Sequence, residues 1–319
     1  MFFLQMRMYF LIAALFGIIY TAIVMIGTSM GKGSFEFYLL ISFGMMFIQY
    51  LLGPKIIEWT MHVKYVTRAE APMLYQMVED LARRAGIPMP KVCMAQIPIP
   101  NAFAFGRGRR DGRVCVTRGI MDLLNEEELR AVLGHELTHI KNRDVLTITL
   151  ISVIPMIMYR IAWHFMFYGR SRNSRDNNTG AMIGIIAFLF YFITNLLVLY
   201  GSRIREYFAD RGSVELGNRP AVLASALYKL VYGSARADKD AVREIEGLKA
   251  FFINDPSRAG LEINELRQLD MDHNGTIDSV ELATFQNRRI KLNFTDHLME
   301  ALSTHPNMLK RIKALAAQG

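Results

Sequence analysis

The stretch HELTHIKNRDVLTITLISVIPMIMY, residues 135–159, joins a metal-binding pattern to an apolar segment. It begins with His-Glu-x-x-His, in which His135 and His139 are four residues apart. On a helix this spacing projects both imidazoles from one face, so both can bind one metal ion. Glu136 lies beside them, where its carboxylate can polarise a water molecule rather than bind the metal. The pattern predicts a hydrolytic zinc site next to an oily segment.

The residues before the pattern predict the start of its helix. Asn125 is a suitable N-cap, and Glu128 three residues later completes a capping box. If the helix continues from His139 to Val145, their six-residue separation spans about 9 Å at about 1.5 Å per residue. We therefore expect the metal to lie within roughly 10 Å of the apolar segment.

Zinc in a hydrolytic site needs a third protein ligand and an open fourth position. The best candidate lies in SRIREYFADRGSVELG, where Glu206 and Asp210 are four residues apart on one helical face. We expect Glu206 to bind the metal. Asp210 would accept a hydrogen bond from a ligand histidine and fix its tautomer. An ordinary surface pair is the alternative.

Four apolar segments predict a multi-span membrane protein. They cover residues 8–31, 37–54, 145–168 and 177–202, and only the third contains a charge, Arg160. Each is long enough to cross about 30 Å of hydrocarbon as a helix. A cleaved signal peptide is the alternative for the first, but its apolar core is too long and a second span follows at once.

Basic residues predict which side of the membrane carries the larger polar regions. If all four segments cross, nine basic residues near the spans lie on the side of the N-terminus and four on the other. The positive-inside rule then places the larger regions and the metal site in the cytoplasm. The loop between segments three and four contains three arginines, so it agrees poorly with the positive-inside rule. Those two segments could form a hairpin that dips into the bilayer without crossing it.

The composition excludes other classes of protein. The chain has 319 residues, of which 52% are hydrophobic, and its net charge is +8. The positively charged residues flank the apolar segments. We find no basic helix or aromatic-basic module, so a nucleic-acid partner is not expected. The two cysteines, Cys93 and Cys115, fit no disulfide framework or C-x-x-C motif, which favours a reducing compartment.

Four motifs together carry a family resemblance: HELTH, EYFAD, the upstream NAFAFG, and STHPNMLKRI near the C-terminus. With them the chain resembles the HtpX-type membrane-integral zinc metalloproteases, relatives of the CaaX proteases with a gluzincin-like active site. The sequence pattern predicts an α+β, mainly helical fold with four transmembrane helices, and the resemblance implies a gluzincin-like zinc protease domain in the cytosol. It implies Glu206 as third ligand and degradation of misfolded or damaged membrane proteins at a prokaryotic cell membrane, with the active site in the cytoplasm.

Two further roles follow from the same resemblance. The segment Asn101, Ala102 and Phe103 matches an edge strand that binds the substrate main chain by strand addition. AFAFG, RGRRDG and RVCVT indicate a β-hairpin over 103–116, which could instead only support the catalytic helix. His305 matches a histidine that stabilises the oxyanion of the tetrahedral intermediate. A lone histidine before a proline is otherwise usually a loop residue.

An inserted segment departs from the family pattern. Residues 270–281, DMDHNGTIDSVE, fit a calcium-binding EF-hand loop, with Gly275 at the sharp turn. The expected calcium ligands are Asp270, Asp272, Asn274, the Thr276 carbonyl, Asp278 and Glu281. We find no second EF-hand loop, so a single EF-hand would bind calcium weakly or pair with the EF-hand of a second molecule. A polar helix-turn-helix without an ion is the alternative.

The expected layout is a transmembrane hairpin (1–66), a first protease segment (67–144), a second transmembrane pair (145–202) and a second protease segment (203–319). The EF-hand insertion lies within the last of these, at about 260–290, and helices are expected at 68–85 and 219–232. The expected partners are polypeptides and the bilayer, and the expected cofactors are Zn²⁺ and, through the insertion, Ca²⁺. The sequence leaves open a CaaX-type processing protease and a calcium-responsive scaffold with an inactive zinc site, as well as substrate and oligomeric state.

Overall fold

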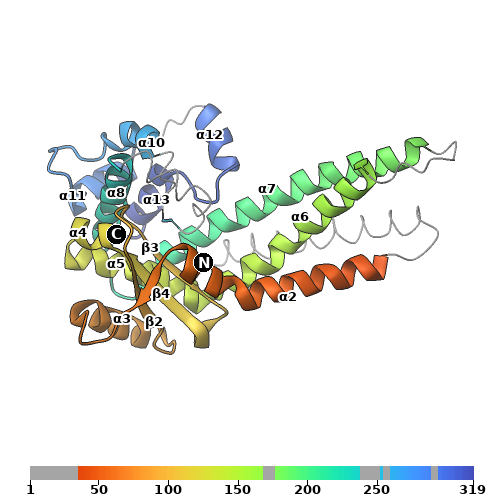
Figure 1. Cartoon of the computed structure of the whole chain (residues 1–319). Helices are drawn as coiled ribbons and strands as arrows, with labels where there is room; N and C mark the ends of the chain where they lie inside the picture. Colours follow the sequence, from red (N-terminus) through yellow and green to blue (C-terminus); the bar gives the residue numbers. More distant parts are fainter. Residues whose placement is uncertain (1–34, 168–176, 238–251, 254–258, 289–293) are drawn as a thin grey trace. The chain divides into compact units, whose positions relative to one another are not determined.

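The computed structural model describes residues 35–167, 177–237, 252–253, 259–288 and 294–319 (Figure 1). The chain divides into two compact units, residues 1–52 with 146–204, and residues 53–145 with 205–319. Residues 53–66 belong to the second unit, although the sequence grouped them with the N-terminal hairpin. The expected first span, residues 8–31, and the arginines between segments three and four lie outside the described residues.

The first unit is helical where it is described. It contains most of α2 (Phe35–Thr60), α6 (Asp144–Phe167) and α7 (Asn177–Glu215). Helices α6 and α7 lie side by side (Figure 1). Ile151 and Ile154 of α6 pack in one cluster with Val198 of α7, and the Tyr159 and Tyr191 ring centroids are 5.5 Å apart.

The described residues support some of the predicted membrane topology. Among them, one helix, Met182–Glu215 within α7, is long and apolar enough to cross a membrane. Its exposed apolar side chains include Ile185, Phe188 and Leu189, as expected for a helix that contacts lipid. The number of spans, four, stays a prediction.

A four-stranded sheet forms the centre of the second unit. Its strands are β1 (Val63–Tyr65), β2 (Lys91–Ala95), β3 (Ala102–Gly106) and β4 (Gly112–Thr117), in the order β1-β2-β4-β3. Strands β2 and β4 are parallel, and the other pairs are antiparallel. The predicted β3–β4 hairpin is confirmed, with the short 3-10 helix Arg109–Asp111 in its turn. Strand β3 is therefore an edge strand.

Both faces of the sheet are covered, because side chains along a strand alternate between faces. On one face, Val114 and Val116 of β4 belong to the large core with α5 and α3. On the other, Cys115 packs with Phe103 and Phe105 of β3. The sheet is thus held rigidly, and β3 with it.

The predicted catalytic helix is α5 (Glu126–Asn142), and its capping box is confirmed. The Glu128 N–H donates to Asn125 Oδ1 at 2.9 Å, and the Asn125 N–H donates to Glu128 Oε2 at 3.1 Å. The helix ends at Arg143, which adopts a left-handed conformation (φ 57°), and α6 begins at Asp144. The expected unbroken helix into the apolar segment is therefore wrong, because residue 143 turns the chain, and the estimate of about 9 Å along one helix does not hold.

Helices complete the second unit, so the α+β, mainly helical fold is confirmed. The expected helix at 68–85 is α3 (Pro72–Ala85), which begins at a proline in its first turn, and that at 219–232 is α8 (Pro220–Ala235). The rest are α4 (Arg118–Leu123), α10 (Ala259–Leu266), α11 (Ser279–Gln286), α12 (Phe294–Ala301) and α13 (Met308–Ala316). Helices α10 and α11 flank the EF-hand-like loop as predicted.

Candidate metal centre

Two glycines allow α5 to approach the last turns of α7 closely. A Cβ at Gly212 of α7 would overlap the side chain of Thr138 on α5. A Cβ at Gly134 of α5 would come within 2.8 Å of Ser213 Oγ, which donates to the Ala131 carbonyl at 2.6 Å. Because the backbones are this close, the histidines of α5 lie against the carboxylates of α7.

The atoms expected to bind zinc have the spacing that zinc requires. His135 Nε2 and His139 Nε2 are 3.2 Å apart. His135 Nε2 lies 3.6 Å from Glu206 Oε2, and His139 Nε2 lies 3.6 Å from the other carboxylate oxygen, Glu206 Oε1. Ligand atoms about 2.0–2.1 Å from a tetrahedral zinc ion are about 3.3 Å from one another. A zinc ion therefore fits between these three side chains with little movement.

Glu206 carries an atom that suits a cation. Its side chain is buried, and no hydrogen bond from the described residues reaches Oε2, although Arg311 Nη1 lies 3.2 Å away. A buried carboxylate oxygen normally has a hydrogen-bond partner or a metal. The site thus fits a divalent metal by its donor set, its spacing and this oxygen.

Each histidine has a carboxylate at its other ring nitrogen. Asp210 Oδ1 lies 2.9 Å from His135 Nδ1, the position expected from the sequence, although the contact does not have the angles of a hydrogen bond. Asp144 Oδ2 lies 2.6 Å from His139 Nδ1. A carboxylate at Nδ1 holds the proton there and leaves Nε2 free to bind metal. Sequence reasoning missed Asp144, which directly follows the residue that ends the helix.

Two arginines, also missed, balance these carboxylates. Arg205 Nε lies 3.2 Å from Asp144 Oδ1. Arg311 is fully buried and binds Asp210 with Nε at 2.9 Å and Nη2 at 2.6 Å. The only signal for Arg311 was its place in STHPNMLKRI, six residues after His305. Its burial comes from tertiary packing, which a single sequence does not display.

The site's electrostatics favour a protonated His135 when no metal is bound. Burial lowers the pKa of His135, but the Asp210 and Glu206 carboxylates outweigh it and raise the pKa to about 9. Burial raises the pKa of Glu136, and hydrogen bonding from the backbone N–H of Ala104 opposes the rise. Glu136 therefore faces edge strand β3, and one of its carboxylate oxygens lies within 4.8 Å of one ring nitrogen of each of His135 and His139.

His305 lies beside this cluster, in the turn before α13. Its Nδ1 is 3.5 Å from Glu206 Oε2, and the imidazole is mostly buried. Among the residues that the structure describes, neither ring nitrogen has a hydrogen-bond partner. The structure thus brings His305 to the cluster of His135, His139 and Glu206.

The three residues expected to bind substrate lie inside the protein. Asn101, Ala102 and Phe103 are all buried. The Asn101 side chain accepts a hydrogen bond from the Ile253 N–H at 3.1 Å, and the Ile253 carbonyl accepts one from Arg311 Nη1 at 2.9 Å. Asn101 thus supports Arg311 through one backbone unit, and none of the three residues is open to a substrate.

The loop of residues 270–281 brings three carboxylates together. One oxygen from each of Asp270, Asp272 and Glu281 falls in a group whose atoms are all within 4.8 Å. Gly275 has φ 82°, as a sharp turn requires. Asp278 caps α11 and forms a capping box with Glu281. The Tyr228 hydroxyl of α8 donates to Asp270 Oδ2 at 2.9 Å, which connects the loop to the core.

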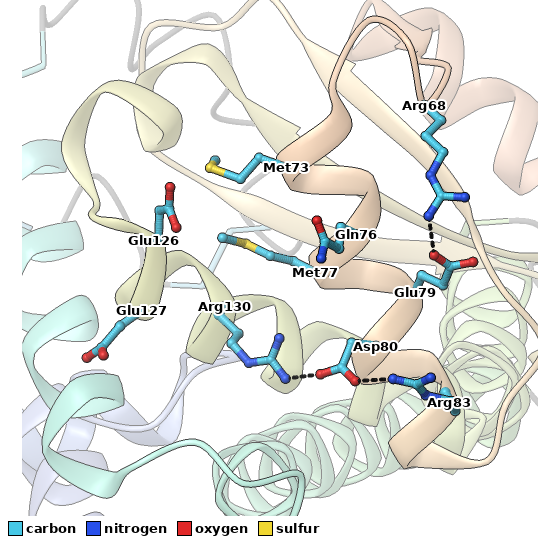
Figure 2. Close-up of a pocket in the computed structure, with 10 residues that line it drawn as sticks. All are labelled: Arg68, Met73, Gln76, Met77, Glu79, Asp80, Arg83, Glu126, Glu127 and Arg130. Carbon is cyan, nitrogen blue, oxygen red and sulfur yellow. Dashed lines mark hydrogen bonds and ion pairs between the residues drawn. The ribbon is translucent and has the colours of Figure 1, made fainter.

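A groove of about 570 Å³ lies away from the metal centre, between α3 and the start of α5 (Figure 2). Most of its charges pair within the groove. Arg130 and Arg83 both bind Asp80 (Figure 2), and mainly through these hydrogen bonds the pKa of Asp80 falls to about 2. The groove contains none of the expected catalytic residues.

A buried histidine pair flanked by carboxylates, at about the spacing of zinc ligands, fits the site of a metallopeptidase. The model of peptidase family M48 matches residues 68–318. The chain belongs to peptidase family M48, and the family implies zinc.

Curated relatives agree with this assignment. The chain is 55% identical to "Protease HtpX homolog" of Methanothermobacter thermautotrophicus, over 72% of this chain and 86% of that one. It is 38% identical to a "Protease HtpX homolog" of Moorella thermoacetica, over 70% of this chain and 75% of that one. It is 34% identical to a "Protease HtpX homolog" of Aquifex aeolicus, over 87% of this chain and 82% of that one. These matches support a membrane metalloprotease of the HtpX type.

The chain also aligns with the crystal structure of S. mikatae Ste24p, with a TM-score of 0.48 and 15% identity, over 98% of this chain and 64% of that one. A TM-score below 0.5 does not define a shared fold, so the assignment rests on the sequence matches.

Proposed function

We propose that the chain is a membrane-embedded zinc endopeptidase that cleaves misfolded or damaged membrane proteins on the cytoplasmic side. The observation that carries this proposal is that His135 Nε2 and His139 Nε2 are 3.2 Å apart, and that each lies 3.6 Å from a different carboxylate oxygen of Glu206. The family assignment supports proteolysis over a scaffold with an inactive site.

The side chains divide the work of amide hydrolysis. His135, His139 and Glu206 hold zinc, which when bound polarises the scissile carbonyl and increases the acidity of water. Glu136 removes the proton from the attacking water and delivers it to the leaving amine. The raised pKa of Glu136 suits it to both transfers. His305 donates an N–H to the oxyanion of the tetrahedral intermediate.

Strand β3 holds the substrate through its main chain. The Thr117 N–H donates to the Asn101 carbonyl at 2.9 Å. Because hydrogen-bonded pairs alternate along an antiparallel ladder, Phe103 and Phe105 bond to β4, and Ala102 and Ala104 direct their N–H and C=O groups away from β4. Ala102 is fully buried and Ala104 is half-buried, so the accessible part of this edge is at Ala104. An extended peptide can pair with this edge. The Ala104 N–H already contacts Glu136, so a peptide bound there lies next to the base.

The predicted spans keep the protease at the membrane. Helix α7 contains the apolar segment 177–202 and then, four and eight residues later, Glu206 and Asp210. The excess of basic residues on one side favours a cytoplasmic site. Membrane anchoring raises the effective concentration of other membrane proteins around the site.

The inserted loop adds calcium modulation to the proposal. Oxygen atoms from Asp270, Asp272 and Glu281 supply hard ligands, and the same loop contains Asn274, the Thr276 carbonyl and Asp278. Tyr228 connects Asp270 to α8, and Lys229 of α8 pairs with Glu128 at the N-terminus of α5. Calcium could thus stabilise the packing of α8 on the catalytic helix.

A reconstituted system tests the proposed substrate class. The purified protein is placed in proteoliposomes with zinc, together with a membrane protein in a native form and in a destabilised form. We expect cleavage of the destabilised form at its cytoplasmic segments. Cleavage of one fixed site in both forms would instead indicate a processing protease.

Calcium binding is tested separately. Calcium should raise the thermal midpoint of the wild type but not of Glu281→Gln, because the bidentate carboxylate at the last loop position is lost. Glu215→Gln, which removes a carboxylate from an exposed pair with Arg211, is the matched control. Equal midpoints with calcium and with chelator in the wild type would exclude a calcium site.

A further inference from the structure

The last turns of α2 have one buried and one exposed face. Pro54 and Met61 are buried. On the opposite face Lys55, Ile56 and Trp59 are exposed. Trp59 is 82% exposed, more than any other large apolar side chain that the structure describes. A tryptophan is usually largely buried, so this exposure calls for a partner.

The exposed face continues along the same helix. Ile48, Leu52, Ile56 and Trp59 are all exposed and follow one another at intervals of four, four and three residues, which places them on one face. The first three-quarters of this helix contain the predicted second span, residues 37–54, and Lys55 is the first charge after it. A lysine and a tryptophan just beyond an apolar span are typical of the headgroup layer.

The buried face is fastened to the sheet. Glu58 Oε1 lies 3.0 Å from Arg113 Nε, and Arg113 Nε also donates to the Tyr65 hydroxyl at 2.8 Å. Tyr65 donates in turn to Glu58. Arg113 lies on β4 opposite Phe105 of edge strand β3. The end of α2 is thus joined rigidly to the strand pair that includes β3.

We propose that Ile56 and Trp59 lie in the bilayer interface, at the boundary between headgroups and acyl chains. They anchor the second unit there and fix the depth of β3 relative to the membrane surface. Amphipathic surfaces of this kind lie about 5–10 Å into that boundary. The inference rests on the proposed membrane insertion of α2, because Ile56 and Trp59 would contact the same bilayer that the preceding span crosses.

The chain has two tryptophans, Trp59 and Trp163, which permits a direct test. Trp163→Phe leaves Trp59 as the only reporter, and Trp59→Phe leaves Trp163 on α6. Each variant is reconstituted in vesicles of phosphatidylcholine and phosphatidylglycerol. The lipids carry bromine at a shallow or a deep acyl position, and iodide serves as the aqueous quencher.

We expect Trp59 to be quenched more by shallow than by deep bromine and to be largely protected from iodide. Full iodide quenching of Trp59, with Trp163 still quenched by brominated lipid, would overturn the anchor and leave membrane insertion intact. Protection from iodide without bromine quenching would also overturn it, because a protein surface would then cover Trp59. If neither tryptophan responds to bromine, both the anchor and the proposed insertion fail.

Discussion

Arg311 and Asp210 form a fully buried pair with two hydrogen bonds, Nε to Oδ2 at 2.9 Å and Nη2 to Oδ1 at 2.6 Å. The third nitrogen of Arg311, Nη1, lies 3.2 Å from Glu206 Oε2 and donates to the Ile253 carbonyl. One side chain thus orients both carboxylates of α7 that face the histidines.

Removing Arg311 should therefore damage both folding and metal binding. Arg311→Met removes both guanidinium hydrogen bonds from the buried Asp210 carboxylate, and we expect a loss of about 3–5 kcal/mol in the free energy of unfolding. Zinc affinity should fall about 10- to 100-fold, because Asp210 no longer holds His135 in place. Thermal unfolding in detergent and zinc competition with a chelating dye measure the two effects.

Two further variants give this prediction its controls. Arg311→Lys keeps the charge but cannot form the two-pronged contact, so it should restore the zinc affinity incompletely. Arg68→Met removes an exposed pair with Glu79 and should change little. Wild-type zinc affinity in Arg311→Met would show that Arg311 does not orient the ligands.

Asp144→Asn should weaken zinc binding about 10- to 100-fold, because an amide can orient His139 but no longer increases its basicity. The contact at stake is the 2.6 Å approach of Asp144 Oδ2 to His139 Nδ1. Asp122→Asn, in an exposed pair with Arg118, is the control. Equal zinc affinity in the two variants would argue against a role for Asp144.

Gly212→Ala should separate α5 from α7, because the new methyl overlaps Thr138. Overpacking of this kind costs about 1–3 kcal/mol. Zinc affinity should fall too, since the histidines and Glu206 lie on the two helices that move apart. Gly260→Ala, where no atom lies within 4 Å of the added Cβ, should change neither the free energy of unfolding nor the zinc affinity. A zinc affinity unchanged in Gly212→Ala would mean that close packing does not set the site.

Stabilisation by zinc should increase with pH. The pKa of His135 rises on folding from 6.5 to about 9, so its proton stabilises the metal-free protein fully below pH 6.5. That contribution is lost as the pH rises through 9. Zinc needs the unprotonated imidazole, so the difference in melting temperature between zinc-loaded and chelated protein should grow from pH 6.5 to 9 at buffered free zinc. A constant or shrinking difference would contradict the assignment.

Local rules account for what the sequence predicted well. The capping box at Asn125 and the β3–β4 hairpin are set by neighbouring residues, and the structure has both. The left-handed turn at Arg143 has no glycine or proline that would predict it from the sequence. Strand β1 is three residues long, too short for an alternating pattern.

Long-range contacts account for what was missed at the site. Arg311 meets Asp210 across 101 residues of sequence, and Asn101 reaches Ile253 across 152. In the sequence, Arg311 is indistinguishable from an ordinary polar residue. Asn101 was predicted to contact substrate. Their roles depend on burial, which only the packed structure shows.

The central claim, that His135, His139 and Glu206 bind zinc while Glu136 acts as the base, is tested most directly by two assays on the same samples. Zinc content and cleavage of an unfolded polypeptide are measured in the wild type, Glu136→Gln and Glu206→Gln. We predict that Glu136→Gln retains zinc and loses cleavage, whereas Glu206→Gln loses zinc. Loss of zinc from Glu136→Gln with retention in Glu206→Gln would exchange the two roles, and a zinc-loaded, fully active Glu136→Gln would contradict the account.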